Sequence, residues 1–272
     1  MPSSRWTKFK QRIRGKLAHS QNLRQGYAFD FATQQLPEHQ ENYPHLWSEF
    51  TTLIPQKSGN QGNDESRLQN IQLATQRVDS LVLEPQQIFS FWHRIPFPST
   101  KNGFREGPAF MNGEITKDVG GGLCLVSTNL FNTFLLGGCQ IIERHNHSID
   151  PYGERRFFPL GRDATVFYGY KDLMVRNSLA IALQLRTEVN GEQGEVKSSL
   201  WGMAPNPWAI KVESAVIAES EPPTAQGMPG YEVETVRSTR SAQANATHPE
   251  PWQTNYTALS SYNPCPYSYY SG

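Results

Sequence analysis

The chain has 272 residues, of which 37% are hydrophobic and 18% charged, and its mean hydropathy of -0.58 predicts one folded domain with extensions that add little to the core. Its 25 basic and 25 acidic residues cancel, so we expect no nucleic-acid partner. Three widely spaced cysteines argue against a disulfide framework, and no membrane-spanning or secretory-signal pattern occurs, so we expect a cytoplasmic protein.

Residues 1–65 are expected to form a basic amphipathic helix followed by an irregular connector. Seven basic residues precede the first acidic residue, Asp30, and they are Arg5, Lys8, Lys10, Arg12, Arg14, Lys16 and Arg24. Trp6, Phe9, Ile13 and Leu17 recur among them at helical spacing. Such a helix either docks on its own domain with its charges in solvent or lies on an anionic membrane surface, which would make the protein peripheral at the membrane.

Residues 66–212 are expected to form the folded domain. Apolar spacing from Leu68 to Val82 predicts a helix that ends before Pro85, and Ile88–Trp92 predicts a strand entering the core. Asn112-Gly113 indicates a hairpin between two short strands. The pattern favours an α+β fold, with a largely antiparallel twisted sheet packed against a central helix.

A Gly-rich turn before that central helix is the first candidate site. Gly120, Gly121 and Gly122 permit positive φ and let backbone N–H groups approach a ligand or a reacting oxygen. Helical spacing over 126–136 then places Cys124 at a helix N-terminus. The helix dipole there lowers a thiol pKa, and a thiolate is a nucleophile or a metal ligand.

A strand over 139–148 is expected to return along this helix and to supply a histidine. Its alternation puts Glu143, His145 and His147 on one face, so either histidine could meet Cys124. A later strand, over 164–168, is expected to follow Asp163. A second hairpin is predicted around Asn190-Gly191.

Four motifs in this order resemble the VanW family, over about Ser66 to Thr187. The motifs are Ile88–Trp92, Gly120–Cys124, Glu143–Ser148, and Gly161–Val166 followed by Tyr170–Leu173. The family has no established reaction. Because it is named from vancomycin-resistance gene clusters, the resemblance implies a cell-wall-type peptide or precursor as the substrate. The chain departs from the family pattern at Leu125, where the family usually has Gln.

The sequence order Cys, His, Asp indicates thiol acyl-transfer chemistry. Cys124, His147 or His145, and Asp163 follow the order found in transglutaminase-like and NlpC/P60-like cysteine enzymes. The histidine would take the thiol proton, the thiolate would attack an amide carbonyl, and the acid would orient the imidazole. The glycine-turn amides would hold the oxyanion. Other acids, namely Asp150, Asp172 and Glu143, compete with Asp163 for this role.

Two other interpretations stay open. A His-x-His pair with Cys124 could hold zinc, although neither C-x-x-C nor H-E-x-x-H occurs. Alternatively the domain only binds a peptide or protein partner, with the glycine turn cradling a carboxylate. No nucleotide-binding glycine spacing is present, and we expect no metal and no other cofactor.

Residues 213–272 are expected to form a mostly disordered tail. They are rich in Pro, Ser, Thr, Ala, Gln and Glu, and they offer few apolar residues to offset the entropy of ordering. Residues 230–236 are expected to add at most one edge strand. The sequence thus predicts a central domain between two flexible extensions.

Overall fold

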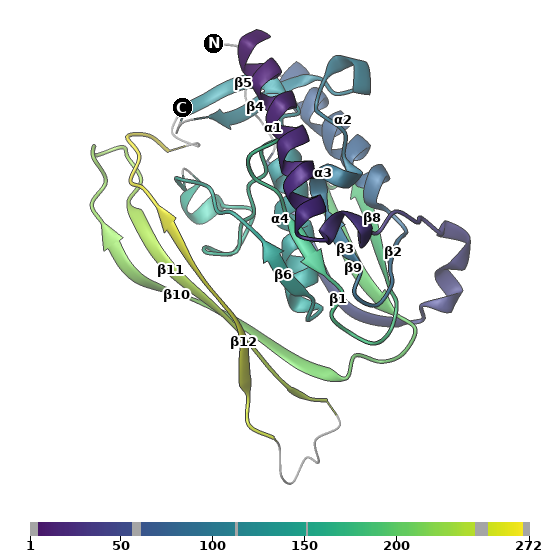
Figure 1. The fold of residues 1–272 in the computed structure, drawn as a ribbon. Coiled ribbons are helices and arrows are strands. Elements are labelled where there is room, and N and C mark those ends of the chain that lie inside the picture. The colour runs from purple at the N-terminus through teal and green to yellow at the C-terminus, as the bar shows by residue number, and fades with distance from the viewer. Residues whose placement is uncertain (1–4, 56–60, 112–113, 151, 243–249, 269–272) are drawn as a thin grey trace.

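The computed structural model describes residues 5–55, 61–111, 114–150, 152–242 and 250–268 (Figure 1). In these ranges the α-helices are α1 (Arg5–Arg24), α2 (Gln61–Val78), α3 (Phe91–Arg94) and α4 (Leu123–Leu136). The strands are β1 (His45–Leu53), β2 (Leu81–Leu83), β3 (Ile88–Ser90), β4 (Glu106–Met111), β5 (Glu114–Val119), β6 (Gln140–Glu143), β7 (Met174–Arg176), β8 (Leu183–Asn190), β9 (Glu195–Gly202), β10 (Trp208–Ser220), β11 (Gly230–Ser241) and β12 (Gln253–Tyr262). None of the described helices has the length and apolar composition needed to cross a bilayer.

The named strands pair antiparallel in four sheets. The sheets have the orders β1-β9-β8-β2, β3-β7-β6, β4-β5 and β10-β11-β12. Figure 1 shows α4 in the middle of the molecule, with the long β10–β12 sheet along one side and α1 and α2 on the other. The expected α+β class, with a largely antiparallel sheet structure around a central helix, is confirmed.

Helix α4 forms the centre of the core because its apolar side chains point in every direction. Leu130, Phe131 and Phe134 are fully buried. A buried amide also ties the helix to the largest sheet, since Asn129 Nδ2 donates to Phe50 O at 2.9 Å and to Val196 O at 3.1 Å. Backbone carbonyls of β1 and β9 thus gain a side-chain donor, and the helix is fixed along the sheet.

Several predicted boundaries are shifted, for local reasons. The helix predicted to reach Val82 ends at Val78, and Leu81–Leu83 is instead a buried strand, because a short apolar run suits either structure. The strand predicted over Ile88–Trp92 stops at Ser90, whose hydroxyl accepts a hydrogen bond from the His93 N–H and starts α3. Both predicted hairpins form, as β4–β5 and β8–β9, although Asn112-Gly113 lies outside the described residues.

The prediction of a disordered tail is wrong for most of the described part of 213–272. Strand β11 is the middle strand of a three-stranded sheet and not an edge strand. Beyond Gly230 at its start, the buried positions along it are Val233, Thr235, Arg237 and Thr239. Three of these four are polar and are satisfied by hydrogen bonds, so the apolar alternation that marks a half-buried strand is missing from the sequence.

Arg237 anchors this sheet to α4. Its side chain is buried, and Nη1 donates to Leu135 O at 3.1 Å and to Cys139 O at 2.8 Å, while Nε donates to Asn255 Oδ1 at 2.8 Å. These carbonyls lie at the C-terminal end of α4, where a cation is favoured by the helix dipole. One side chain therefore caps the helix and binds the sheet to it.

We predict that Arg237→Met lowers the free energy of unfolding by about 2–4 kcal/mol, because Leu135 O and Cys139 O each lose a charged donor and Leu135 O keeps the longer bond from the Gly138 N–H. Urea denaturation monitored by far-UV circular dichroism measures the change. Arg240→Met is the matched control on the same strand, since Arg240 is half-buried over the Trp252 ring and should lose less than about 1 kcal/mol. Equal losses in the two variants would contradict the anchoring role.

Candidate active site

The turn that precedes α4 requires glycine. Gly120 and Gly122 have φ of +98° and +102°. A Cβ on Gly122 would also lie 3.0 Å from Arg67 Cγ and Ile71 Cγ1 of α2. The chain therefore passes close over α2 before it starts α4, and only glycine fits this path without strain.

A single buried amide side chain from α2 holds the turn in place. Asn70 Nδ2 donates to Gly121 O at 3.0 Å and to Arg105 O at 2.9 Å, and its Oδ1 accepts from the Arg105 N–H at 2.8 Å. Asn70 is fully buried, so these bonds are not exchanged with water. Cys124, two residues into α4 from the turn, is consequently held on a rigid support.

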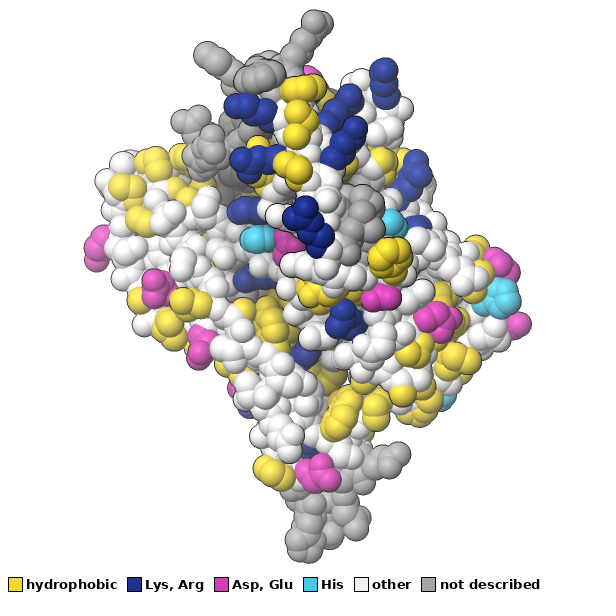
Figure 2. All heavy atoms as spheres, viewed as in Figure 1, with side chains coloured by type: hydrophobic (Ala, Val, Ile, Leu, Met, Phe, Trp, Pro, Cys, Tyr) yellow, Lys and Arg dark blue, Asp and Glu magenta, His cyan; other side chains and the backbone are white. Residues whose placement is uncertain are grey.

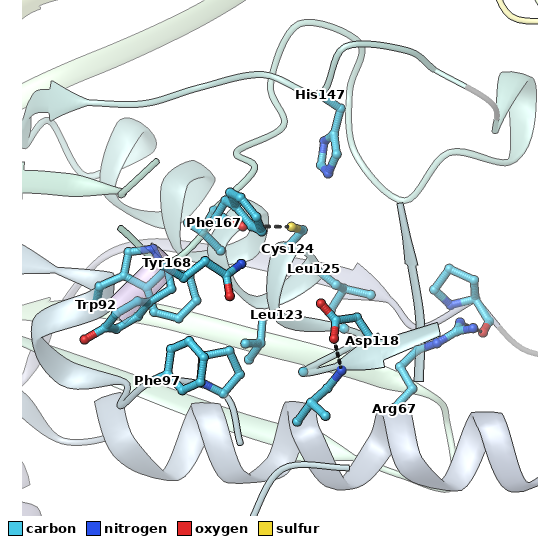
Figure 3. Close-up of a pocket in the computed structure, with 18 of the residues that line it drawn as sticks. Arg67, Trp92, Phe97, Asp118, Leu123, Cys124, Leu125, His147, Phe167 and Tyr168 are labelled. Atoms are coloured by element: carbon cyan, nitrogen blue, oxygen red, sulfur yellow. Dashed lines mark hydrogen bonds between the residues drawn. The ribbon is translucent and has the colours of Figure 1, made fainter. Parts of the chain in front are cut away.

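Cys124 opens onto a pocket of about 150 Å³ (Figure 3). Its thiol and the His147 ring both line this pocket. Aromatic side chains form much of the wall, namely Trp92, Phe97, Tyr152, Phe157, Phe167 and Tyr168. Lys8 and Gln11 of α1 also line it, so the N-terminal helix closes part of the pocket.

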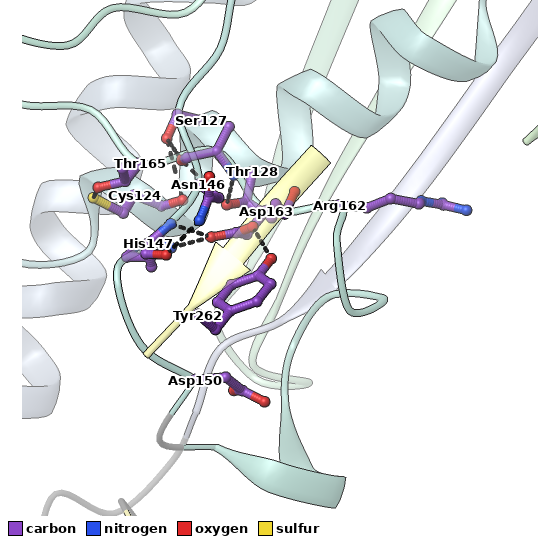
Figure 4. Close-up of polar contacts among 12 residues, drawn as sticks. Cys124, Ser127, Thr128, Asn146, His147, Asp150, Arg162, Asp163, Thr165 and Tyr262 are labelled. Carbon is purple, nitrogen blue, oxygen red and sulfur yellow. Dashed lines mark hydrogen bonds and ion pairs between the residues drawn. The ribbon is translucent and has the colours of Figure 1, made fainter. Parts of the chain in front are cut away.

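His147 joins the thiol to a buried carboxylate. Its Nδ1 lies 2.5 Å from Asp163 Oδ2, which also accepts the His147 backbone N–H at 2.7 Å. These two contacts fix the ring and leave Nε2 for the thiol of Cys124, toward which the ring points (Figures 3 and 4). The three side chains therefore lie in the order thiol, imidazole, carboxylate.

The charge on Asp163 is fully compensated, although the side chain is inaccessible to solvent. Its Oδ1 accepts from Arg144 Nη2 at 2.9 Å and from the Tyr262 hydroxyl at 2.5 Å (Figure 4). Burial alone would raise the pKa of this carboxyl, but the hydrogen bond and charge of His147, the charge of Arg144 and the Tyr262 hydroxyl lower it to about 2. Asp163 is therefore ionised throughout the physiological range.

The same contacts favour an ion pair between thiol and imidazole. Burial acts to lower the pKa of His147, but the hydrogen bonds and charges of Asp163 and Cys124 raise it to about 10. Burial likewise acts to raise the pKa of the Cys124 thiol, but His147, the Thr165 hydroxyl and the Val166 backbone together bring it below its ordinary value. Both shifts run in the direction that favours a thiolate paired with an imidazolium over the neutral pair.

Polar side chains of α4 hold the backbone directly after Asp163. Ser127 Oγ donates to Ala164 O at 2.6 Å, and the Ala164 N–H donates to Thr128 Oγ1 at 2.9 Å. The segment 164–168, predicted as a strand, forms no continuous ladder: Ala164 is bound by these α4 side chains, the Thr165 N–H donates to His145 O, and Phe167 makes an isolated bridge with Lys171. Thr165, the next residue, lies beside the thiol, with its Oγ1 3.5 Å from Cys124 Sγ.

His145 does not share the position of His147. The strand predicted over 139–148 ends at Glu143, so alternation no longer decides where the two histidines point. His145 Nε2 lies 2.9 Å from Glu143 Oε1, an interaction on the surface. Of the two histidines, the structure brings His147 to Cys124.

The competing acids are engaged elsewhere. Asp150 binds Arg156, with Nη2 and Nε at 2.8 and 2.9 Å from Oδ2. Asp172 accepts from the Ser90 hydroxyl at 2.6 Å and from the Trp92 N–H at 3.1 Å. In the described part of the chain, no group of three His, Cys, Asp or Glu side chains is arranged to hold a metal. His145, one member of the His-x-His pair considered for zinc, contacts Glu143.

Sequence reasoning missed the residues that support Asp163. Arg144 lies within the Glu143–Ser148 motif, but the alternation of side chains there does not indicate that it binds Asp163. Besides the Nη2 contact with the carboxylate, its Nε donates to Asp163 O at 2.6 Å. Tyr262 lies in the segment expected to be disordered, so no sequence signal pointed to it. Both contacts come from parts of the chain distant from the Gly-rich turn.

The fold and the pocket define an α+β protein with a Cys-His-Asp constellation at the N-terminus of its central helix. The chain belongs to the family described as VanW like protein, whose family model matches residues 66–201. It is 32% identical over 156 residues to the "Uncharacterized protein YoaR" of Bacillus subtilis, and the matched stretch covers 55% of this chain and 50% of that protein.

A second relative carries a functional name. The chain is 31% identical over 130 residues to the "Vancomycin B-type resistance protein VanW" of Enterococcus faecalis, over 47% of each chain. The chain thus spans about half the length of the curated relatives it matches. No solved structure matches this chain.

Asp172 generates a prediction about pH. Burial, together with the charge of Glu143, raises its pKa from 3.8 to about 7, against hydrogen bonds that lower it. Because the folded state holds this proton more tightly, Asp172 lowers the free energy of unfolding as pH rises from about 4 to 7. Asp172→Asn removes this effect.

We therefore expect Asp172→Asn to gain more than about 2 kcal/mol of stability relative to wild type between pH 4.5 and pH 8. Denaturant titrations of both proteins at the two pH values measure this difference. A difference between variant and wild type that does not change with pH would show that Asp172 is ionised in the fold.

Proposed function

We propose that this protein is a thiol-dependent hydrolase or acyltransferase acting on amide bonds. The observation that carries the proposal is the position of His147, which binds the buried Asp163 through Nδ1 and points its other nitrogen at Cys124 in the pocket. A buried cysteine with a structural role needs neither a charged imidazole nor access to a pocket. Both are requirements of a nucleophile.

In the proposed reaction, the thiolate of Cys124 attacks the carbonyl carbon of the substrate amide and forms a tetrahedral oxyanion. The His147 imidazolium gives its proton to the amide nitrogen, the C–N bond breaks, and a thioester remains on Cys124. His147 then takes a proton from water or from an acceptor amine as it attacks the thioester, the C–S bond breaks, and the carboxylic acid or new amide leaves while the Cys124 thiolate and the His147 imidazolium are restored. Asp163 keeps the imidazole oriented and stabilises its positive charge.

The start of α4 supplies donors for the oxyanion. The N–H groups of Leu123 and Leu125 bond to the carbonyls of Gly120 and Gly122. The N–H of Cys124, between them, has no backbone acceptor among the described residues, and it points along a helix axis whose dipole favours negative charge. This amide, with those of Gly121 and Gly122, is the proposed oxyanion site, whereas the Gly120 N–H already donates to Arg105 O at 3.1 Å.

For the substrate we propose cell-wall-type peptides. One relative is named as a vancomycin B-type resistance protein, and the proposal transfers that connection to this chain. The aromatic pocket wall suits a peptide with apolar side chains. Leu125, which stands where the family usually has Gln, lies on the pocket wall and makes this side of the pocket apolar.

We predict that Cys124 reacts with iodoacetamide with an apparent pKa below the ordinary thiol value of about 8.5. The reaction is followed by mass spectrometry on a C139A/C265A background, because both of those thiols are buried and burial raises their pKa, to about 12 for Cys139. His147→Ala should move the midpoint upward, because burial then acts on the thiol without the opposing imidazolium.

His145→Ala is the matched control for this experiment, since His145 pairs with Glu143 and not with the thiol. The pH dependence of its labelling should match that of the C139A/C265A protein. A midpoint at or above 8.5 in the parent, or equal shifts in the two histidine variants, would rule out the thiolate–imidazolium pair.

We further predict hydrolysis of purified muropeptides, detected in mass spectrometry as pairs of fragments whose masses add up to that of the substrate plus one water. Cys124→Ala and His147→Ala should each lower the rate by about 10³-fold or more, whereas His145→Ala should change it by less than about threefold. If the thiol pKa is low but muropeptides are not hydrolysed, the reactive cysteine is supported and muropeptides are excluded as its substrates. Muropeptide binding with unchanged affinity in Cys124→Ala and no turnover would instead support the binding-module interpretation.

A further inference from the structure

Helix α1 carries its apolar stripe on the outside. Phe9, Ile13 and Leu17 are 52%, 44% and 58% exposed, although their i, i+4, i+8 spacing is the one normally buried against a domain. From this stripe and the charges around it, we infer that the outer face of α1 binds an anionic lipid surface. This inference does not depend on the proposed reaction.

The stripe is exposed because α1 docks through its opposite face. Gln11 is 6% exposed, and Gly15 lies so close to the domain that a Cβ there would be 2.4 Å from Tyr168 Cε1. The backbone of Gly169 approaches Gln11 and Gly15 in the same way. Helix α1 is thus docked on its own domain with its charges in solvent, and because a small and polar face makes the contact, its apolar stripe is exposed as well.

Basic side chains border the apolar stripe. Figure 2 shows a column of hydrophobic side chains with Lys and Arg on both sides, at the position of α1 in Figure 1. The exposed basic residues of the helix are Lys10, Arg12, Arg14, Lys16 and Arg24, and α1 contains no acidic residue. Arg12 and Arg14 extend over the rings of Phe97 and Tyr170, which spreads the helix charge across the adjoining surface.

This combination fits a lipid surface better than a second copy of the chain. A symmetric contact between two α1 helices would bring two basic stripes together and would be opposed by charge repulsion. An anionic bilayer offers acyl chains to the three apolar side chains and headgroup charges to the flanking cations at once. Because Lys8 and Gln11 also line the Cys124 pocket, binding would place that pocket close to the membrane.

Vesicle co-sedimentation tests the inference with the full chain. We expect binding to vesicles of phosphatidylcholine with phosphatidylglycerol and at least tenfold weaker binding to phosphatidylcholine alone. The variant F9Q/I13Q/L17Q should lose at least tenfold in partition coefficient. K10Q/K16Q should also bind more weakly, and its binding should depend less on salt concentration.

The matched control is V216Q/I217Q/L259Q, which removes three hydrophobic side chains of similar exposure, 50%, 57% and 57%, from the distant β10–β12 sheet. It should bind as wild type does, and circular dichroism checks that each variant is folded. Equal binding to neutral and anionic vesicles, or undiminished binding by both α1 variants, would overturn the inference. A change of oligomeric state in light scattering without vesicle binding would do the same and assign the face to contact between copies.

Discussion

The buried carboxylate of Asp163 is the constraint on which the arrangement of this protein depends. An isolated carboxylate in a protein interior is strongly unfavourable, so its oxygens need charged or polar partners. Here they receive the His147 backbone and ring, the Arg144 guanidinium and the Tyr262 hydroxyl. Satisfying one anion therefore brings together the loop after β6, the segment that lies on α4, and the last strand. The orientation of the imidazole toward the thiol is a result of that packing.

The sequence predicted the parts of the site that depend on local structure. A run of glycines followed by helical spacing was sufficient to place Cys124 at a helix start, since both signals act over a few residues. Which histidine faces the thiol was beyond such reasoning. The chain leaves β6 after Glu143, and an irregular loop bound by tertiary hydrogen bonds decides the direction of His145 and His147. The choice among the acids depended likewise on contacts made across the fold.

The same distinction explains the errors at both ends of the chain. Helix α1 was predictable from its periodicity, but the face it docks with was not, because the close approach of Gly15 to Tyr168 outweighs the apolar stripe. The C-terminal sheet was missed because its buried positions carry Thr and Arg in place of Val and Ile. In both cases hydrogen bonds or backbone proximity replace the hydrophobic contrast that sequence patterns detect.

The Tyr262 contact has a consequence for how the boundaries of this protein should be drawn. The family model ends at residue 201, yet Tyr262, whose hydroxyl donates to Asp163, and Ser260, whose hydroxyl accepts from Arg144, come some sixty positions later. A fragment ending at residue 201 would therefore keep Cys124, His147 and Asp163 but leave the buried carboxylate without its tyrosine donor, so the segment matched by the family is shorter than the unit that supports this constellation.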